Sequence, residues 1–226
     1  MGLYSIQHFW FDELAAVRST SAVVLIAVGL LACDRSGSQA SSNVSADTRD
    51  SSNRAALRES ASLENQLVSS TGIGGIRLGM TLDEARRAVP SAKFQRTSDG
   101  EGIALVEVVL APGSSMIVWA HEDDPDAPVD WSKTIRMIET FSPVFHTAEG
   151  VHAGALVADV EKIYGKIREI AKSEIESREY IVFDKQPAGV TFRLNHTGVF
   201  PDGSPTTTEV GPGAMIQSIA VSSSSR

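Results

Sequence analysis

The feature that most constrains the fold of this chain is a stretch of fifteen residues that occurs twice, 75 positions apart. Residues 75–89 align with residues 150–164, so that Gly75 corresponds to Gly150 and Gly79 to Gly154. Beyond the second glycine of each copy, apolar residues recur at every third position, which is the spacing of the buried face of a short helix. These residues are Leu82, Ala85 and Ala88 in the first copy and Val157, Val160 and Ile163 in the second.

Each copy predicts a glycine turn that leads into a helix. Glycine reaches the positive φ angles that a sharp strand-to-helix turn uses, and we therefore assign a structural turn role to Gly75, Gly79, Gly150 and Gly154. Thr81 and Glu84 have the spacing of a capping box, whereas Leu156 stands at the Thr81 position of the second copy. We expect helices over 81–89 and 156–164, ended by Pro90 and Gly165.

Three strand-like runs follow each expected helix. In the first copy they are 103–110, 115–120 and 134–139, and in the second they are 179–183, 189–194 and 215–221. Their alternation favours an antiparallel sheet with one face covered by helices. The predicted fold class is α+β, with tandem (β)αβββ repeats at 72–146 and 147–222, short helices packed on one face of the sheet, and a disordered tail at 223–226.

Gly79-Met80-Thr81, with Glu84 and Ala85, resembles the entry motif of the β-lactamase inhibitor protein-like repeat and of the related small outer-membrane assembly lipoproteins. The second copy matches this motif only at Gly154 and in its apolar spacing. The resemblance covers about 150 residues. It implies a binding scaffold that presents its sheet face and loops to another protein and carries out no chemistry.

The N-terminal part contains an apolar run from Ala22 to Ala32 that ends at Cys33, the single cysteine of the chain. A membrane-spanning helix needs about 20 apolar residues, and a plain secretory signal would end in an A-x-A-like site. A buried core helix is a further alternative, but the following residues are too polar to pack against it. Leu30-Leu31-Ala32-Cys33 instead resembles a bacterial lipobox.

This resemblance implies that residues 1–32 are a signal peptide and that Cys33 is lipidated and anchors the chain to a membrane, facing the periplasm. Leu30, Leu31 and Ala32 would form the signal-peptidase recognition site. Asp34 follows the cysteine, and the choice between inner and outer membrane stays open.

Residues 33–71 comprise the lipidated cysteine and a tether, because Ser, Asn and Asp dominate this segment and cannot bury enough surface to offset its ordering entropy. The net charge of the whole chain is −8. An acidic chain without a clustered basic face is a poor nucleic-acid binder, so we expect no nucleic-acid partner.

Two polar segments contain side chains of the kinds that ligate metals. The loop 121–130 carries several carboxylates, but it lacks the EF-hand spacing and contains two prolines. His146 and His152 lie on either side of Glu149, but no third zinc ligand is placed by the sequence. We interpret the loop as a solvated connection and the histidines as surface residues, and we expect no metal and no cofactor.

No nucleophile motif of the G-x-S-x-G type is present, and the glycines at 72–75 lack phosphate-binding spacing. We therefore expect no catalytic residues and no enzymatic activity. The favoured function is a non-catalytic protein-interaction module of the cell envelope, with another envelope protein as its partner. The alternative is an envelope sensor that binds a small ligand or a metal.

The aromatic residues separate these functions only if their location is known. Trp119 falls in an expected strand and Trp131 just before the next one. On the covered face of the sheet they would be core residues, and on the outer face they would be binding anchors. The sequence alone does not assign the face.

Overall fold

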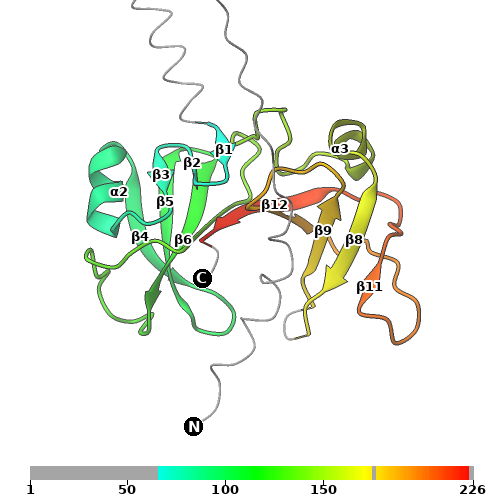
Figure 1. Cartoon of the computed structure of the whole chain (residues 1–226). Helices are drawn as coiled ribbons and strands as arrows, with labels where there is room; N and C mark the ends of the chain where they lie inside the picture. The colour runs from blue at the N-terminus through cyan, green and yellow to red at the C-terminus, as the bar shows by residue number, and fades with distance from the viewer. Residues whose placement is uncertain (1–65, 175–176, 224–226) are drawn as a thin grey trace, which may run out of the picture. The chain divides into compact units, whose positions relative to one another are not determined.

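The computed structural model describes residues 66–174 and 177–223, which belong to one compact unit (Figure 1). The predicted signal peptide, the lipobox residues Leu30, Leu31, Ala32 and Cys33, and the tether up to residue 65 lie outside the described residues. The fold is α+β, a mostly antiparallel sheet with two short helices.

A sheet of nine strands runs through the whole unit in the order β11-β8-β9-β10-β12-β7-β6-β5-β4. Its first half contains β4 (Lys93–Ser98), β5 (Ala104–Ala111), β6 (Ser114–Glu122) and β7 (Met137–Thr140). Its second half contains β8 (Ile167–Lys172), β9 (Glu179–Phe183), β10 (Val190–Leu194), β11 (Thr206–Thr207) and β12 (Ile216–Ser222). The two halves join where β7 pairs with β12.

A small second sheet precedes the first helix. It consists of β1 (Val68–Ser69), β2 (Gly72–Ile73) and β3 (Ile76–Arg77), paired in that order. Val68 is buried and its backbone N–H donates to His146 O at 2.8 Å. The folded part therefore begins before residue 72, where the sequence had placed the end of the tether.

The two helices begin and end where local signals indicate. In α2 (Leu82–Ala88), Thr81 is the N-cap and forms the predicted capping box with Glu84, with the Glu84 N–H to Thr81 Oγ1 distance at 3.2 Å. In α3 (Val157–Tyr164), Leu156 is the N-cap and makes no side-chain cap bond. Gly165 ends α3 with a φ of 82°.

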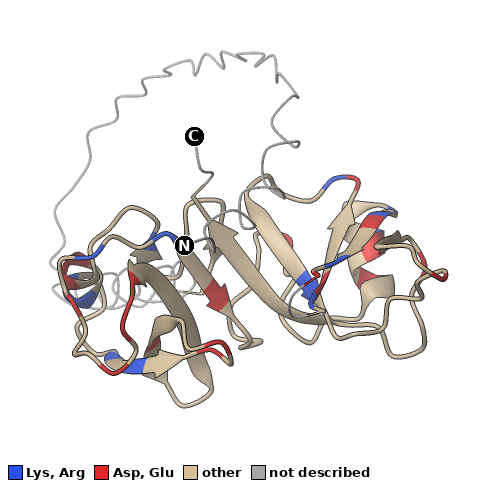
Figure 2. Ribbon diagram, turned by 90° about the horizontal axis from the view of Figure 1, so that it is seen from below, with Lys and Arg blue, Asp and Glu red and all other residues tan. Residues whose placement is uncertain are grey.

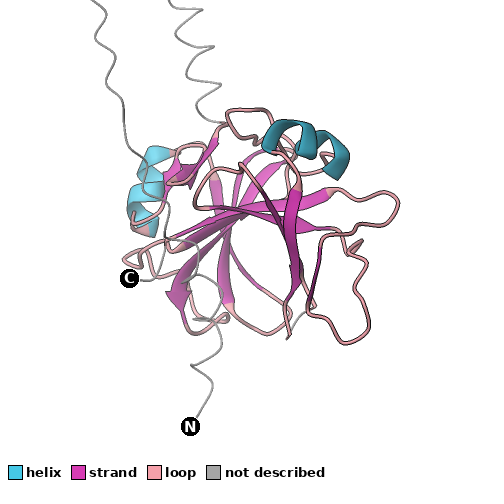
Figure 3. Cartoon of the chain, turned by 45° about the vertical axis from the view of Figure 1, so that its right-hand side comes forward, coloured by secondary structure: helices cyan, strands magenta, loops and turns pink. Residues whose placement is uncertain are grey.

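The strand register places the buried residues of both halves on one face of the sheet. Val106 faces Val118, Val118 faces Ile138, and Ile138 faces Val221. All four are fully or almost fully buried, and they share a single core with Leu82 of α2 and Val160 of α3. Both helices lie on this covered face, on the upper side of the sheet in Figure 3.

The strand count differs from the prediction. The structure adds β4 directly after α2 and β8 directly after α3, so four long strands follow each helix instead of three. It also adds the two-residue β11. At the C-terminus, Ser223 donates from its backbone N–H to Arg136 O at 2.9 Å, and so it belongs to the fold although the sequence assigned it to the tail.

Three of the four predicted turn glycines have positive φ: 84° at Gly79, 87° at Gly150 and 90° at Gly154. Gly75 is an exception, because the positive φ in the turn between β2 and β3 belongs to its neighbour Gly74, at 58°. Gly75 is therefore a turn residue without the backbone conformation that the prediction assigned to it.

The glycine turn before each helix is held by the same three backbone hydrogen bonds. In the first half they run from Gly79 N to Ile135 O (2.9 Å), from Ile135 N to Met80 O (2.8 Å) and from Leu82 N to Lys133 O (2.9 Å). In the second half the equivalent bonds run from Gly154 N to Ile216 O (2.7 Å), from Ile216 N to Ala155 O (2.9 Å) and from Val157 N to Ala214 O (3.0 Å). In both halves, the segment that leads into the last strand thus fixes the start of the helix.

Candidate interaction surface

One face of the nine-stranded sheet is not covered by either helix, and we name it the open face. In the first half its residues alternate with the core residues of β5, β6 and β7. They include Leu105, Glu107 and Val109 on β5, Ile117 and Trp119 on β6, and Met137 and Glu139 on β7, and every one of them is partly exposed. Figure 2 shows charged residues on strands as well as on helices and loops, and Glu107 and Glu139 are the two charged members of this set.

Trp119 is the largest side chain of the open face. Its strand partner is Met137, and its ring lies against the ring of His121, with the centroids 4.0 Å apart. His121 has a φ of 53°, which is unusual for a residue other than glycine. Residues two positions apart on a strand share a face, so His121 lies on the open face with Trp119. The register between β5 and β6 shifts next to this point, between Ala104 and Val106, as it does at a bulge.

Trp131, by contrast, belongs to the covered face. Its ring packs against Phe94 at 5.8 Å between centroids, and the Arg86 guanidinium of α2 lies 4.4 Å from its ring centre. The structure therefore assigns the two tryptophans to opposite faces, a distinction that the sequence left open.

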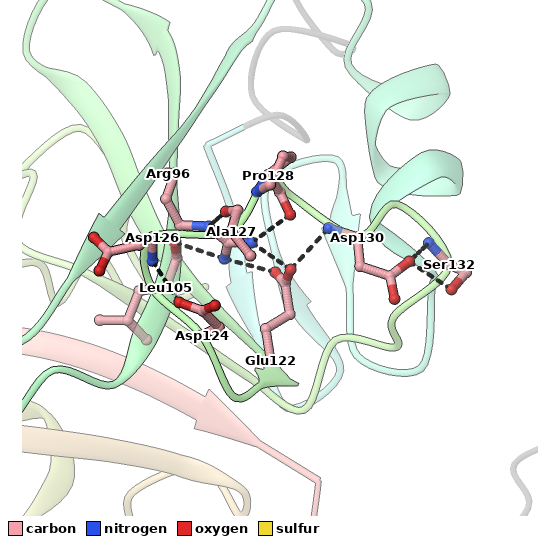
Figure 4. Close-up of polar contacts among 9 residues, drawn as sticks. All are labelled: Arg96, Leu105, Glu122, Asp124, Asp126, Ala127, Pro128, Asp130 and Ser132. Atoms are coloured by element: carbon pink, nitrogen blue, oxygen red, sulfur yellow. Dashed lines mark hydrogen bonds and ion pairs between the residues drawn. The ribbon is translucent and has the colours of Figure 1, made fainter.

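An ion pair fixes the loop that follows β6 (Figure 4). Arg96 on β4 pairs with Glu122 on β6 through both of its terminal nitrogens, with Nη1 to Oε1 at 2.8 Å. The Arg96 guanidinium also donates to the carbonyl oxygens of Ala127 and Pro128, each at 3.1 Å. Glu122 in turn accepts the backbone N–H of Asp130 at 2.8 Å.

This ion pair is well shielded from solvent, because Glu122 is only 8% exposed. The hydrogen bonds to Glu122 raise the pKa of the Arg96 guanidinium above its ordinary value, although burial acts in the opposite direction. Removing one partner would leave an uncompensated buried charge, which is strongly destabilising. The loop 123–130 is thus held in one position by Arg96 of β4 and Glu122 at the end of β6.

The carboxylates and histidines that we did not expect to bind a metal take part in hydrogen bonds within the domain. Glu122 serves Arg96, Asp124 Oδ1 accepts the Asp126 N–H at 2.9 Å, and Asp130 Oδ1 accepts the Ser132 N–H and hydroxyl. His146 and His152 face each other in an isolated bridge, and each Nδ1 lies within 3.0 Å of the carbonyl oxygen of its following residue. Over residues 66–174 and 177–223, no group of three or more His, Cys, Asp or Glu could hold a metal ion.

Two buried polar interactions could not be predicted from the sequence. Arg96 and Glu122 are 26 positions apart, and Arg96 lies in a strand that was not predicted. Tyr164 is buried, and its hydroxyl donates to Glu149 Oε2 at 2.6 Å and lies 2.6 Å from Thr147 Oγ1. The one signal in the sequence was a tyrosine at the apolar end of α3, because a buried tyrosine hydroxyl needs a hydrogen-bond partner.

Comparison with known proteins finds similarity to a solved structure. No family model matches the chain, and no curated protein matches it. The crystal structure of the uncharacterized protein yfeY from Escherichia coli is similar at 13% identity, with a TM-score of 0.46, over 70% of this chain and 99% of that one. No helix among the described residues is long and apolar enough to cross a membrane.

Proposed function

We propose that this chain is a lipid-anchored protein of the bacterial cell envelope that works as a non-catalytic interaction module, with the open face as its binding surface. The single observation that carries the interaction role is the partly exposed apolar row of the open face, centred on Trp119 beside His121. Exposed apolar patches on a soluble domain mark sites of association, and tryptophan is enriched among residues that dominate binding energy.

The second part of the proposal is that the domain arose from two copies of one αββββ unit. Its support is the recurrence of the hydrogen bonds before each helix at equivalent positions. His121 and His196, 75 positions apart, both have positive φ, at 53° and 58°. At the junction, Glu139 pairs with Ala220, which lies 81 positions later. The flanking pairs are Ile138 with Val221 and Thr140 with Ile219, and adding 81 to the first residue of either pair gives the second residue of the other. A two-fold axis through the sheet requires this reciprocal pairing.

The envelope location rests on the lipobox Leu30-Leu31-Ala32-Cys33. Cys33→Ala should abolish labelling by a palmitate analogue in growing cells, because only the cysteine thiol accepts the lipid. A Ser36→Ala chain serves as the control and should be labelled like the original. Retained label in Cys33→Ala would contradict the anchor. Fractionation of the labelled cells then shows whether the inner or the outer membrane contains the protein.

The interaction role is tested by photo-crosslinking in intact cells. A photoreactive amino acid in place of Ile117 lies on the open face, and one in place of Ile163, which is 42% exposed on α3, lies on the covered side as the matched control. We expect a defined crosslinked envelope protein from position 117 alone, reduced roughly tenfold or more by Trp119→Ala. The same product from both positions, or one that survives Trp119→Ala unchanged, would contradict the proposal.

A further inference from the structure

The second half of the domain contains an excursion that the first half lacks. Between β10 and β12 the chain runs outward from Gly198 and returns at Val210, and these two residues form an antiparallel bridge at its base. Within the excursion, β11 pairs with the edge strand β8. A hollow of about 510 Å³ opens between β8 and the two arms of the excursion, lined by Arg168, Glu169, Val199, Phe200, Pro201 and Thr206 to Glu209.

The walls of this hollow, which we name the β8–β11 pocket, are fixed by several contacts. A Cβ atom on Gly198 would lie 2.6 Å from the Phe200 ring, so glycine at this position allows the ring to pack directly on the backbone. The Gly198 N–H donates to Glu179 Oε2 at 2.9 Å. Across the arms, the Val199 N–H donates to Glu209 O at 2.9 Å. The pocket is therefore shaped before any ligand arrives.

Three charged side chains line the pocket, and none is engaged by another side chain of the described residues. Arg168 is exposed on β8 and makes no ion pair there, in contrast to Arg96 in the first half. Glu169 and Glu209 likewise make no side-chain hydrogen bond within the described part of the chain. The hydrogen bonds of Glu209 use its backbone, whose N–H donates to Thr207 Oγ1 and whose carbonyl oxygen accepts from the Val199 N–H. One cation and two acidic residues thus line the same hollow, and no ion pair or side-chain hydrogen bond of the described residues joins them.

This combination selects a particular chemistry. A guanidinium binds a carboxylate through two parallel hydrogen bonds, whereas two carboxylates nearby disfavour a doubly charged anion such as phosphate and favour an ammonium group. Phe200, Val199 and Pro201 supply an apolar wall, and the volume lies in the range of small-molecule sites, roughly 300–1,000 Å³. We propose that the β8–β11 pocket binds a short zwitterionic peptide, with its carboxylate on Arg168, its ammonium between Glu169 and Glu209, and an apolar side chain against Phe200.

The test is a titration of the isotope-labelled full chain, held in detergent micelles, with the dipeptide alanyl-phenylalanine, followed by backbone NMR. Millimolar peptide should shift signals of residues 168–169, 199–200 and 206–209. Arg168→Gln should weaken binding roughly tenfold or more, because a charge-assisted pair is lost. Arg77→Gln, at an exposed arginine on β3, is the matched control and should leave the affinity unchanged.

Two modified probes separate the charges of the ligand. The N-acetylated dipeptide lacks the ammonium, and the dipeptide amide lacks the carboxylate, so each should bind several-fold more weakly than the parent. The proposal is overturned if no shifts occur at these residues, if Arg168→Gln binds as well as the original chain, or if both modified peptides or inorganic phosphate bind as tightly as the dipeptide. The pocket lies beside β8 and β11, whereas Trp119 lies on β6 in the other half of the sheet, and either proposal can fail without the other.

Discussion

At the start of the second half, one buried hydroxyl links three residues. Tyr164 is 3% exposed and donates to Glu149, and the Thr147 hydroxyl donates to the tyrosine oxygen. Burial and the hydrogen bond to Glu149 raise the pKa of the Tyr164 phenol. The same hydrogen bond from Tyr164 lowers the pKa of the Glu149 carboxyl below its ordinary value of 4.5. The charged form of Glu149 is therefore favoured in the folded state.

This coupling predicts a pH-dependent stability. A carboxyl whose pKa is lower in the folded state contributes stability that is present above its unfolded pKa and lost as the pH falls through the folded pKa. Tyr164→Phe should thus cost about 1 kcal/mol near neutral pH, a modest value because Glu149 is exposed to solvent. The difference between the two proteins should shrink below about pH 4.5.

Urea unfolding at a series of pH values measures this difference. Glu149→Gln is the control, because the amide still accepts a hydrogen bond but does not titrate. In that background, the cost of Tyr164→Phe should not change over the acidic range. If the cost in the original chain is also the same at every pH, the hydrogen bond to an ionised Glu149 does not stabilise the fold.

At the scale of elements, local signals were sufficient for the helices and insufficient for the edge of the sheet. The capping box of Thr81 and Glu84 predicted the start of α2, because a cap depends only on neighbours in the chain. β4 was missed because Arg96 occupies a position that faces the covered side, opposite the fully buried Val106. An inward-pointing charge is a known protection of edge strands, but its partner Glu122 is distant in the sequence.

The candidate surface was predictable only in part, for a related reason. Alternation along β6 could be read from the sequence, but which alternate set faces solvent depends on the register between strands and on where the helices pack. Trp119 and Trp131 were equally plausible as core residues until the register placed Trp119 beside Met137. The register shift between β5 and β6 next to His121 depends on contacts between strands, and no local pattern predicts it.

At the scale of the whole molecule, the two halves share one sheet and one core. Ile138 and Val221 are both fully buried and face each other at the junction of β7 and β12. The last element of the chain therefore completes the centre of the sheet. Neither half can bury its side of this junction alone, although each contains its own helix and four long strands.

The domain should consequently unfold in a single transition. Both described tryptophans, Trp119 and Trp131, lie in the first half, whereas circular dichroism reports the strands of both halves. In a Trp10→Phe background, which removes the tryptophan outside the described residues, urea transitions followed by fluorescence and by circular dichroism should coincide. Ile138→Ala at the junction should lower the free energy of unfolding by about 2–5 kcal/mol, because it leaves a cavity shared by the two halves. Both transitions should move to lower urea concentration together. If the fluorescence transition shifts while part of the circular dichroism signal unfolds unchanged, the halves are independent and the shared core does not couple them.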